Sequence, residues 1–239
     1  MRLVTLSSEE MTPEQVDLYR QILSGPRGQE QRAVPLDTGA GGLAGPFNAM
    51  LYAPEVGHAL QELGAAIRFR TSLAPRVRES AILLVAQAWH SAYEQAAHEL
   101  IGHDAGLTDE EIEALRAGAD PGFTDEAERV AYHVVRALTG PTADLNDQHY
   151  AEAVAILGEQ ALVELSALVG YYATLALQLR IFRVVPAQLR AARALPLRIS
   201  WSLSPSNARP RARALDSPGT WEWELVPGLS SPLWDSSLP

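Results

Sequence analysis

Apolar residues recur every three to four positions through most of the first 183 residues, and this helical spacing limits what the chain can fold into. The sequence contains no pair of alternating apolar–polar segments joined by a turn signal, so it predicts no β-hairpin. The sequence therefore predicts an all-α fold. The expected helices cover residues 11–23, 46–52, 54–69, 75–88, 91–104, 125–138, 146–157 and 160–182, and a further helix begins at the capping box Thr108-Asp-Glu-Glu111.

Two irregular stretches interrupt or follow these helices. A Gly- and Pro-rich segment at residues 25–45 predicts a loop. After residue 183 the composition changes: residues 1–183 hold 13 Arg against 25 acids, a net charge of −12, whereas residues 184–239 hold six Arg against four acids, a net charge of +2. We therefore divide the chain into a helical domain at residues 1–183 and a low-order tail at residues 184–239.

The tail is rich in Pro, Ser, Arg and Trp and has neither a helical nor a strand period. Three interpretations are open. It is a disordered extension, a partner-binding or oligomer-wrapping arm, or a stretch translated past the natural end through a shifted reading frame. None of the three gives the tail a catalytic role.

Composition excludes two kinds of chemistry. The chain has no Cys, which rules out disulfides, thiolate nucleophiles, iron–sulfur clusters and Cys-ligated zinc. It also has no Lys, because all 19 basic side chains are Arg, which rules out Schiff-base catalysis and a lysine-anchored pyridoxal cofactor. Any reaction must use carboxylates, histidine and hydroxyl groups.

Charge and hydropathy set expectations for partners and location. The net charge of −10 argues against binding to nucleic acid or to anionic membranes. The N-terminus has no signal-peptide pattern, and the most apolar stretch, residues 161–179, contains Glu164 and is expected to be a buried helix with one edge in water. We therefore expect a cytoplasmic protein.

The residues best suited to chemistry lie between positions 79 and 98. Glu94 and His98 are four residues apart, so on a helix they share one face and can interact. Glu79 lies about three turns earlier on the preceding predicted helix. If the two helices pack together, two carboxylates and one imidazole meet, and their pKa values can be driven apart to give an acid and a base.

Each of these residues also has a purely structural interpretation. Ser91-Ala-Tyr-Glu94 fits a capping box that involves no function. A surface pair of Glu94 and His98 is an ordinary helix contact, and Glu79 is explained equally well as a solvated residue near Arg76. A facial metal site formed by His98, Glu79 and Glu94 is a further alternative.

A family resemblance favours the functional interpretation. The stretch resembles the carboxymuconolactone decarboxylase-like family, which includes alkylhydroperoxidase D. Redox members of that family carry Glu, eleven residues, Cys-x-x-Cys, three residues and His. This chain has Glu79, eleven residues, Ser91-Ala-Tyr-Glu94, three residues and His98. Segments near 45–54, 105–112 and 169–175 also resemble the family, so that the resemblance covers about residues 40–183.

The resemblance implies an alkylhydroperoxidase D-like helical domain of about seven to eight helices that forms homo-oligomers by helix packing. The family's hydroperoxide reduction resembles a thiol cycle, which this Cys-free chain cannot perform. The expected function is therefore a lyase or isomerase that needs no cofactor and acts on a small organic acid or lactone. The alternative is a non-catalytic ligand-binding or assembly protein on the same fold.

The expected catalytic residues are His98 as general acid or base, Glu94 to orient it, Glu79 as the second carboxylate and Ser91 to hydrogen-bond the substrate. Trp89, Tyr93 and Arg76 are the expected substrate-binding residues. We expect no metal, and the chain has no phosphate-binding loop, Ser–His–Asp signature or nucleotide fingerprint.

Overall fold

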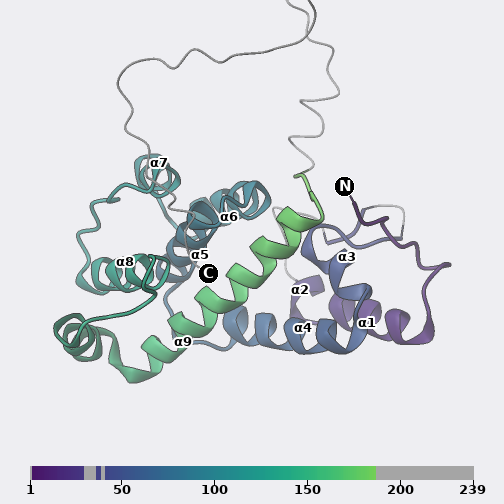
Figure 1. Ribbon diagram of the computed structural model, residues 1–239, viewed down its shortest axis with the longest axis horizontal. Coiled ribbons are helices and arrows are strands. Elements are labelled where there is room, and N and C mark those ends of the chain that lie inside the picture. The colour runs from purple at the N-terminus through teal and green to yellow at the C-terminus, as the bar shows by residue number, and fades with distance from the viewer. Residues whose placement is uncertain (1, 30–35, 39–40, 187–239) are drawn as a thin grey trace, which may run out of the picture. The chain divides into compact units, whose positions relative to one another are not determined.

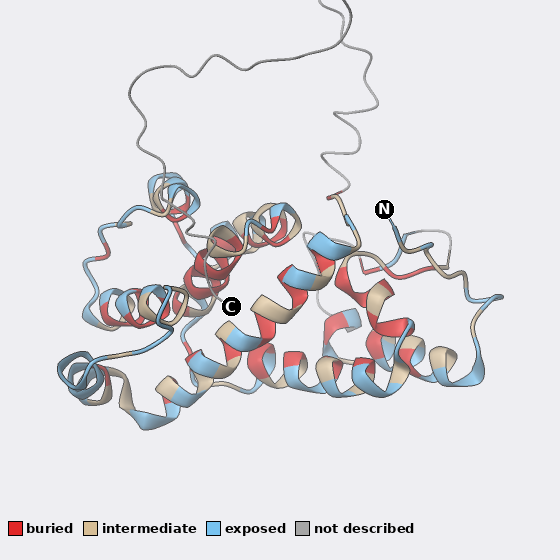
Figure 2. Cartoon of the chain, in the orientation of Figure 1, coloured by how far each residue is buried: buried red, intermediate tan, exposed pale blue. Residues whose placement is uncertain are grey.

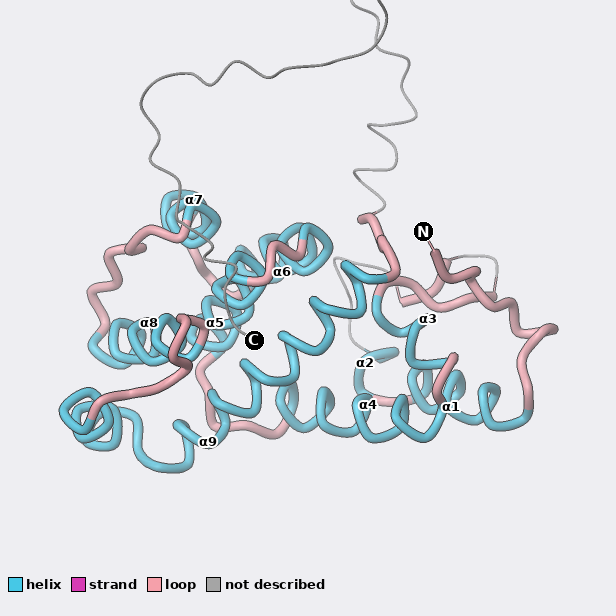
Figure 3. Tube along the Cα trace, viewed as in Figure 1, coloured by secondary structure: helices cyan, strands magenta, loops and turns pink. Residues whose placement is uncertain are grey.

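The computed structural model describes residues 2–29, 36–38 and 41–186, which form helices and loops (Figure 3). These residues contain nine α-helices and, besides them, one isolated antiparallel bridge between Asp37 and Leu43. The all-α prediction is confirmed. The chain divides into two units, residues 1–196 and 197–239. The second unit and residues 187–196 lie outside the described residues, and so does nearly all of the predicted tail.

Proline begins each of the first four helices, where its missing N–H has no intrahelical partner to lose. These helices are α1 (Pro13–Ser24), α2 (Pro26–Gln29), α3 (Pro46–Leu51) and α4 (Pro54–Phe69). The short α2 lies within the segment that the sequence predicted to be a loop. It was missed because four residues are too few to show a helical period.

Five longer helices follow: α5 (Pro75–Ala88), α6 (Ala92–Asp104), α7 (Asp109–Ala117), α8 (Glu126–Leu138) and α9 (Asp147–Ile181). The capping box predicted at Thr108 is present, with both the Thr108 and the Glu111 hydrogen bonds formed. The last two predicted helices form the single element α9, which contains a kink at Gly158. The φ of Gly158 is +83°, a conformation that glycine adopts without a steric penalty.

The central helix of the described residues is α5, which packs against α6, α7, α8 and α9. Its residues are buried almost without interruption from Glu79 to Ala86, and Figure 2 shows this segment in red. Such all-round burial agrees with the unbroken apolar run at residues 81–86. The one charged residue in this buried run is Glu79, so its charge must be balanced within the protein.

The long helix α9 runs between the group formed by α5–α8 and the group formed by α1–α4 (Figure 1). It contributes Leu165, Leu168 and Leu175 to the core. Among the described helices, α9 is the one that is long and apolar enough to cross a membrane, by length and composition only. A single such helix is weak evidence, since the core helix of a soluble protein passes the same test.

Candidate functional site

The site begins with Glu79, whose side chain has no exposed surface. Two arginines lie beside its Oε1 atom. Nη1 of Arg68, which comes from α4, is 3.6 Å away, and Nε of Arg78 is 3.3 Å away. A buried carboxylate is costly unless it is paired and hydrogen-bonded, and these contacts provide part of that compensation.

Helix α6 places an imidazole against the other oxygen of Glu79. His98 Nδ1 lies 2.7 Å from Glu79 Oε2, within hydrogen-bond distance. On the opposite side of the ring, His98 Nε2 lies 3.3 Å from Oε2 of Glu94, one helical turn earlier. Glu79, His98 and Glu94 therefore form a continuous buried chain of three titratable groups, in which His98 is the middle member.

The charges in this chain favour its ionised form. Burial works against a charged His98, but hydrogen bonds to Glu79 and Glu94 and their negative charges outweigh it, so that the pKa of His98 is raised. Burial likewise opposes the ionised form of Glu79, yet the hydrogen bond to His98 and the charges of His98, Arg68 and Arg78 lower its pKa. The raised pKa of His98 and the lowered pKa of Glu79 both favour an imidazolium–carboxylate pair.

A sharp backbone turn between α5 and α6 brings Glu94 and His98 into place. His90 has φ of +49°, and α6 begins directly after Ser91. The capping-box interpretation of Ser91 and Glu94 is wrong, because the Ser91 side chain makes no cap hydrogen bond and Glu94 turns toward His98. Ser91 is buried, and within the described residues its hydroxyl has no hydrogen-bond partner.

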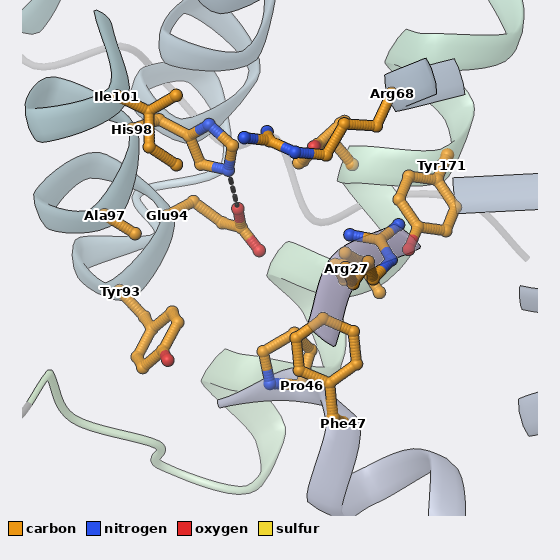
Figure 4. A pocket seen from close by; sticks show the side chains of 12 residues that line it. Arg27, Pro46, Phe47, Arg68, Tyr93, Glu94, Ala97, His98, Ile101 and Tyr171 are labelled. Atoms are coloured by element: carbon orange, nitrogen blue, oxygen red, sulfur yellow. Dashed lines mark ion pairs between the residues drawn. The ribbon is translucent and has the colours of Figure 1, made fainter. Parts of the chain in front are cut away.

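A cavity of about 50 Å³ borders the outer end of this chain, and Figure 4 shows the side chains around it. Glu94 and His98 line it, whereas Glu79 lies behind the imidazole, away from the cavity. The remaining lining residues come from α2, α3, α4, α6 and α9: Arg27, Pro46, Phe47, Arg68, Tyr93, Ala97, Ile101, Tyr171, Tyr172 and Leu175.

Two tyrosines of α9 lie beside the catalytic candidates, and one of them packs on His98. The ring of Tyr172 meets His98 edge-to-face at a centroid distance of 5.2 Å, and Tyr171 meets Tyr172 in the same way at 5.2 Å. Burial, together with the negative charges of Glu79 and Glu94, raises the pKa of Tyr172. Tyr172 therefore stays neutral and fixes the plane of the imidazole.

The structure places the three expected substrate-binding residues in different surroundings. Tyr93 lines the cavity. Trp89 does not: it packs against the core, and its carbonyl accepts a hydrogen bond from Arg180 Nη1 at 2.9 Å. Arg76 also lies outside the lining and binds Glu111 and Glu128, so a substrate-binding role for Arg76 does not fit the structure.

Sequence reasoning missed the two arginines and the tyrosine pair of the cavity. Arg27 lies in the segment that was predicted to be a loop, and Arg68 near the end of α4 had no partner in sequence. Tyr171 and Tyr172 belong to a segment that supported the family resemblance, which was the one available signal. Their role depends on how α2 packs on α4 and how α9 packs on both α4 and α6, which local spacing does not encode.

The arrangement does not suit the metal-site alternative. His98 lies between the two carboxylates, with one ring nitrogen facing each, so the three groups do not converge on one point. Among the described residues, no group of three or more His, Asp or Glu side chains is placed to hold a metal ion.

Comparisons with known proteins agree with this fold. The Carboxymuconolactone decarboxylase family matches residues 54–137, which contain Glu79, Glu94 and His98. A comparison with curated proteins gives no match. A solved structure of the AhpD core from Ralstonia eutropha JMP134, an uncharacterized peroxidase-related protein, is 11% identical with a TM-score of 0.61, covering 79% of this chain and 93% of its own.

The debrominase Bmp8 has a similar structure. A cysteine-to-alanine variant in complex with 2,3,4-tribromopyrrole is 17% identical with a TM-score of 0.59, and covers 81% of this chain and 96% of its own. The apo form of Bmp8 is 18% identical with a TM-score of 0.58, covering 78% and 93%. At these identities the likeness concerns the fold.

The fold and the matched segment define an alkylhydroperoxidase D-like helical protein. Residues 54–137 match the carboxymuconolactone decarboxylase family, and the chain has no cysteine.

Proposed function

We propose that this protein is an acid–base catalyst, a lyase or isomerase that acts on a small organic acid or lactone. One observation carries the proposal: a buried Glu79–His98–Glu94 chain ends at a cavity that is also lined by two arginines. Perturbed titratable groups beside a cavity are typical of catalytic sites. The arginines add positive charge, which favours an anionic substrate.

The three groups have distinct roles in this proposal. Glu79 accepts a hydrogen bond from the Nδ1–H group and thereby fixes the orientation of the ring. Nε2 is then the nitrogen that exchanges protons with the substrate. His98 Nε2 is the general acid. Glu94 shares that proton, and its 3.3 Å separation from Nε2 is longer than the 2.7 Å contact on the other side of the ring. The weaker contact is the one that a substrate displaces.

The proton balance is simple in both reaction types. In a decarboxylation the C–C bond to the departing carboxylate breaks and carbon dioxide leaves. The electron pair passes into a conjugated carbonyl, and carbon then takes the proton from His98, which is replaced from solvent. In an isomerisation Glu94 removes a proton from one carbon and His98 supplies one to another. Such catalysis contributes about 10²–10⁴-fold, and substrate positioning supplies the rest.

The activities named for the similar structures do not transfer to this chain. One is a debrominase whose studied variant lacks a cysteine, and another is peroxidase-related. This chain has no cysteine, and the positions that correspond to the redox pair are Ser91 and Glu94. A thiol cycle would have neither its nucleophile nor its electron store.

The test is proton exchange and bond cleavage in a panel of small lactones and enolisable acids. The protein is incubated with each compound in deuterium oxide, and NMR follows deuterium uptake and release of carbon dioxide. We expect His98→Asn to abolish turnover that the wild type shows. His103→Asn, a partly exposed histidine at the end of α6, is the matched control and should retain it. Equal turnover by wild type and His98→Asn would sink the assignment.

We also propose that the protein is a cytoplasmic homo-oligomer. The support for the oligomer is a set of exposed apolar side chains on α9, of which Val163 is 68% exposed and Leu177 and Ile181 are also exposed. Helix packing between subunits would cover them. Val163→Glu should lower the molecular mass measured by light scattering, and an unchanged mass would exclude this face as the contact.

A further inference from the structure

Arg27 is a buried cation that lines the cavity without a complete set of partners. It comes from α2 and is only 4% exposed. Among the described residues, its Nε and Nη2 atoms have no hydrogen-bond partner. A buried guanidinium without hydrogen-bond acceptors is strongly unfavourable, so that its retention requires an explanation.

The two unpaired nitrogens lie on the same edge of the guanidinium. The N–H groups of Nε and Nη2 point in parallel, and this edge matches the two oxygens of a carboxylate. The guanidinium carbon lies over the Phe47 ring, 5.4 Å from the ring centroid, which is a cation–π distance. This contact involves the charge of Arg27 and leaves its Nε and Nη2 atoms available to a ligand.

A second unpaired polar group lies beside this edge. The Tyr171 hydroxyl is buried and has no well-formed hydrogen bond within the described part of the chain; its near neighbour is Arg27, whose charge acts against the rise in the Tyr171 pKa that burial causes. Tyr171 and Arg27 meet over Gly64 of α4. A Cβ atom at that position would lie 2.1 Å from the Tyr171 oxygen and 2.4 Å from Arg27 Nη2. Glycine thus leaves room for both polar groups, and Figure 4 shows both around the cavity.

We propose that the Nε–Nη2 edge of Arg27, together with the Tyr171 hydroxyl, binds a carboxylate of the substrate. This inference rests on the proposed function in taking the ligand to be the substrate. The bound carboxylate is an anchor and not a leaving group, because a paired guanidinium stabilises the ionised acid. The anchor would hold the rest of the molecule toward Glu94 and His98.

Arg68 is the other arginine of the cavity, and its position suits a different role. Its Nη1 lies 3.6 Å from Glu79, so its charge is already balanced by a carboxylate of the protein. Arg27 lines the cavity but makes no such ion pair among the described residues. The two arginines are therefore separated by role: Arg68 stabilises the Glu79–His98 pair, and Arg27 binds the ligand.

The probe is crotonate, a small planar carboxylate, with crotonamide as its neutral counterpart of nearly equal shape. Isothermal titration of the full chain should show crotonate binding more tightly by roughly tenfold or more, as expected for hydrogen bonds to a charged partner. Equal affinities for the two compounds, or no binding of crotonate, would overturn the proposal.

Variants assign the effect to Arg27. Arg27→Met should reduce the affinity for crotonate to that for crotonamide. Arg27→Lys keeps the charge but not the two-pronged edge, and should give an intermediate affinity. Arg116→Met, a change to an exposed arginine of α7 that binds Glu99 and Glu113, is the matched control and should leave crotonate binding unchanged. Unchanged binding in both Arg27 variants would also overturn the proposal.

A stability measurement separates ligand binding from a structural role. If Arg27 serves a ligand, then Arg27→Met removes an unpaired buried charge and should not lower the melting temperature of the ligand-free protein. A lower melting temperature together with unchanged crotonate binding would make Arg27 structural. His98→Asn should still bind crotonate. If no compound is turned over but Arg27-dependent binding persists, the proposed function fails and this inference stands.

Discussion

Two charged clusters contain residues of α5, and they differ in whether they border the cavity. The first consists of Arg76, Glu111 and Glu128. The second consists of Glu79, His98 and Glu94 with Arg68 and Arg78 beside them. Both join α5 to helices that pack on it. The number of ion pairs alone does not distinguish the two clusters.

The Arg76 cluster is closed. All three guanidinium nitrogens of Arg76 donate: Nε to Glu128 at 2.6 Å, Nη2 to Glu111 at 2.8 Å, and Nη1 to the Gly106 carbonyl. Hydrogen bonds to Glu128 and Glu111 raise the pKa of Arg76 further above its ordinary value. No donor of this guanidinium is left over, so that the cluster fastens α5, α7 and α8 together and offers nothing to a ligand.

The His98 cluster is open on one side. Its inner contact, between Glu79 and His98 Nδ1, is short and away from the cavity, while Glu94 and His98 Nε2 face the cavity. The contrast shows how structural and functional ion pairs are told apart in this fold. The difference is whether the last group of the cluster faces a cavity.

The largest expected effect is on turnover. Glu94→Gln removes the cavity-facing carboxylate, so the proton shared with His98 Nε2 loses its partner, and kcat/KM for any compound turned over should fall about 10²-fold. Glu128→Gln makes the same chemical change in the closed cluster and should leave kcat/KM nearly unchanged. Steady-state kinetics measures both. Equal losses in the two variants would erase the distinction between open and closed clusters.

The next effect is on stability. Glu79→Gln leaves His98, Arg68 and Arg78 without their shared anion in a fully buried position, and should lower the free energy of unfolding by about 3 kcal/mol. Glu111→Gln, in a partly exposed pair, should cost about 1 kcal/mol. Urea unfolding measures both. A loss for Glu79→Gln no larger than that for Glu111→Gln would show that Glu79 is not the buried anion described here.

The sequence predicted much of the open cluster, because two simple rules apply to it. Glu94 and His98 are one turn apart, and Glu79 lies on the neighbouring helix at a distance along the chain that matches the family frame. The arrangement within the cluster was not predicted. Glu79 was expected to be the second catalytic carboxylate, yet it lies behind His98 and away from the cavity, because residues 79–86 of α5 are buried and His98 of α6 covers it.

The sequence could not distinguish the structural roles of the arginines from their functional roles. Arg76 and Arg78 are two residues apart on α5, which places them on different sides of a helix, and their sequence surroundings are similar. Arg78 contacts Glu79, whereas Arg76 reaches α7 and α8. Arg27 lies outside any periodic segment. The partners of a long side chain are set by tertiary packing, which the local pattern does not contain.

The dependence of stability on pH should also differ between the clusters. The pKa of His98 is raised above its ordinary value of 6.5, so its contribution is complete below that pH and is lost as pH rises through the raised value. The pKa of Glu79 is lowered from 4.5, so its contribution is complete above that pH and is lost as pH falls through the lowered value. The pair therefore contributes most between about 4.5 and 6.5.

Urea unfolding of wild type and His98→Asn across this range checks the signs. The difference in unfolding free energy should be largest between these two pH values and should shrink as pH rises further. For Arg76→Met the difference should stay flat on the alkaline side and shrink only in acid, because the lowered pKa of Glu111 is the one that is then crossed. A His98 difference that grows with rising pH would contradict the ionised pair.

The smallest expected effect is that of salt. Arg76 is 28% exposed and its cluster reaches solvent, so that added ions screen it, whereas Glu79 and His98 are shielded from ions by the surrounding helices. The cost of Arg76→Met should therefore fall by a few tenths of a kcal/mol, about the worth of an exposed pair, between low salt and about 1 M sodium chloride. The cost of Glu79→Gln should stay constant over the same range, because Glu79 is buried where dissolved ions do not reach it.

Urea unfolding at both salt concentrations gives the comparison, with the salt dependence of wild type subtracted from each variant. Equal salt sensitivity in the two variants would mean that the His98 cluster is hydrated to the same degree as the Arg76 cluster, and an imidazole in that setting would lose the electrostatic advantage on which acid–base catalysis at this cavity depends.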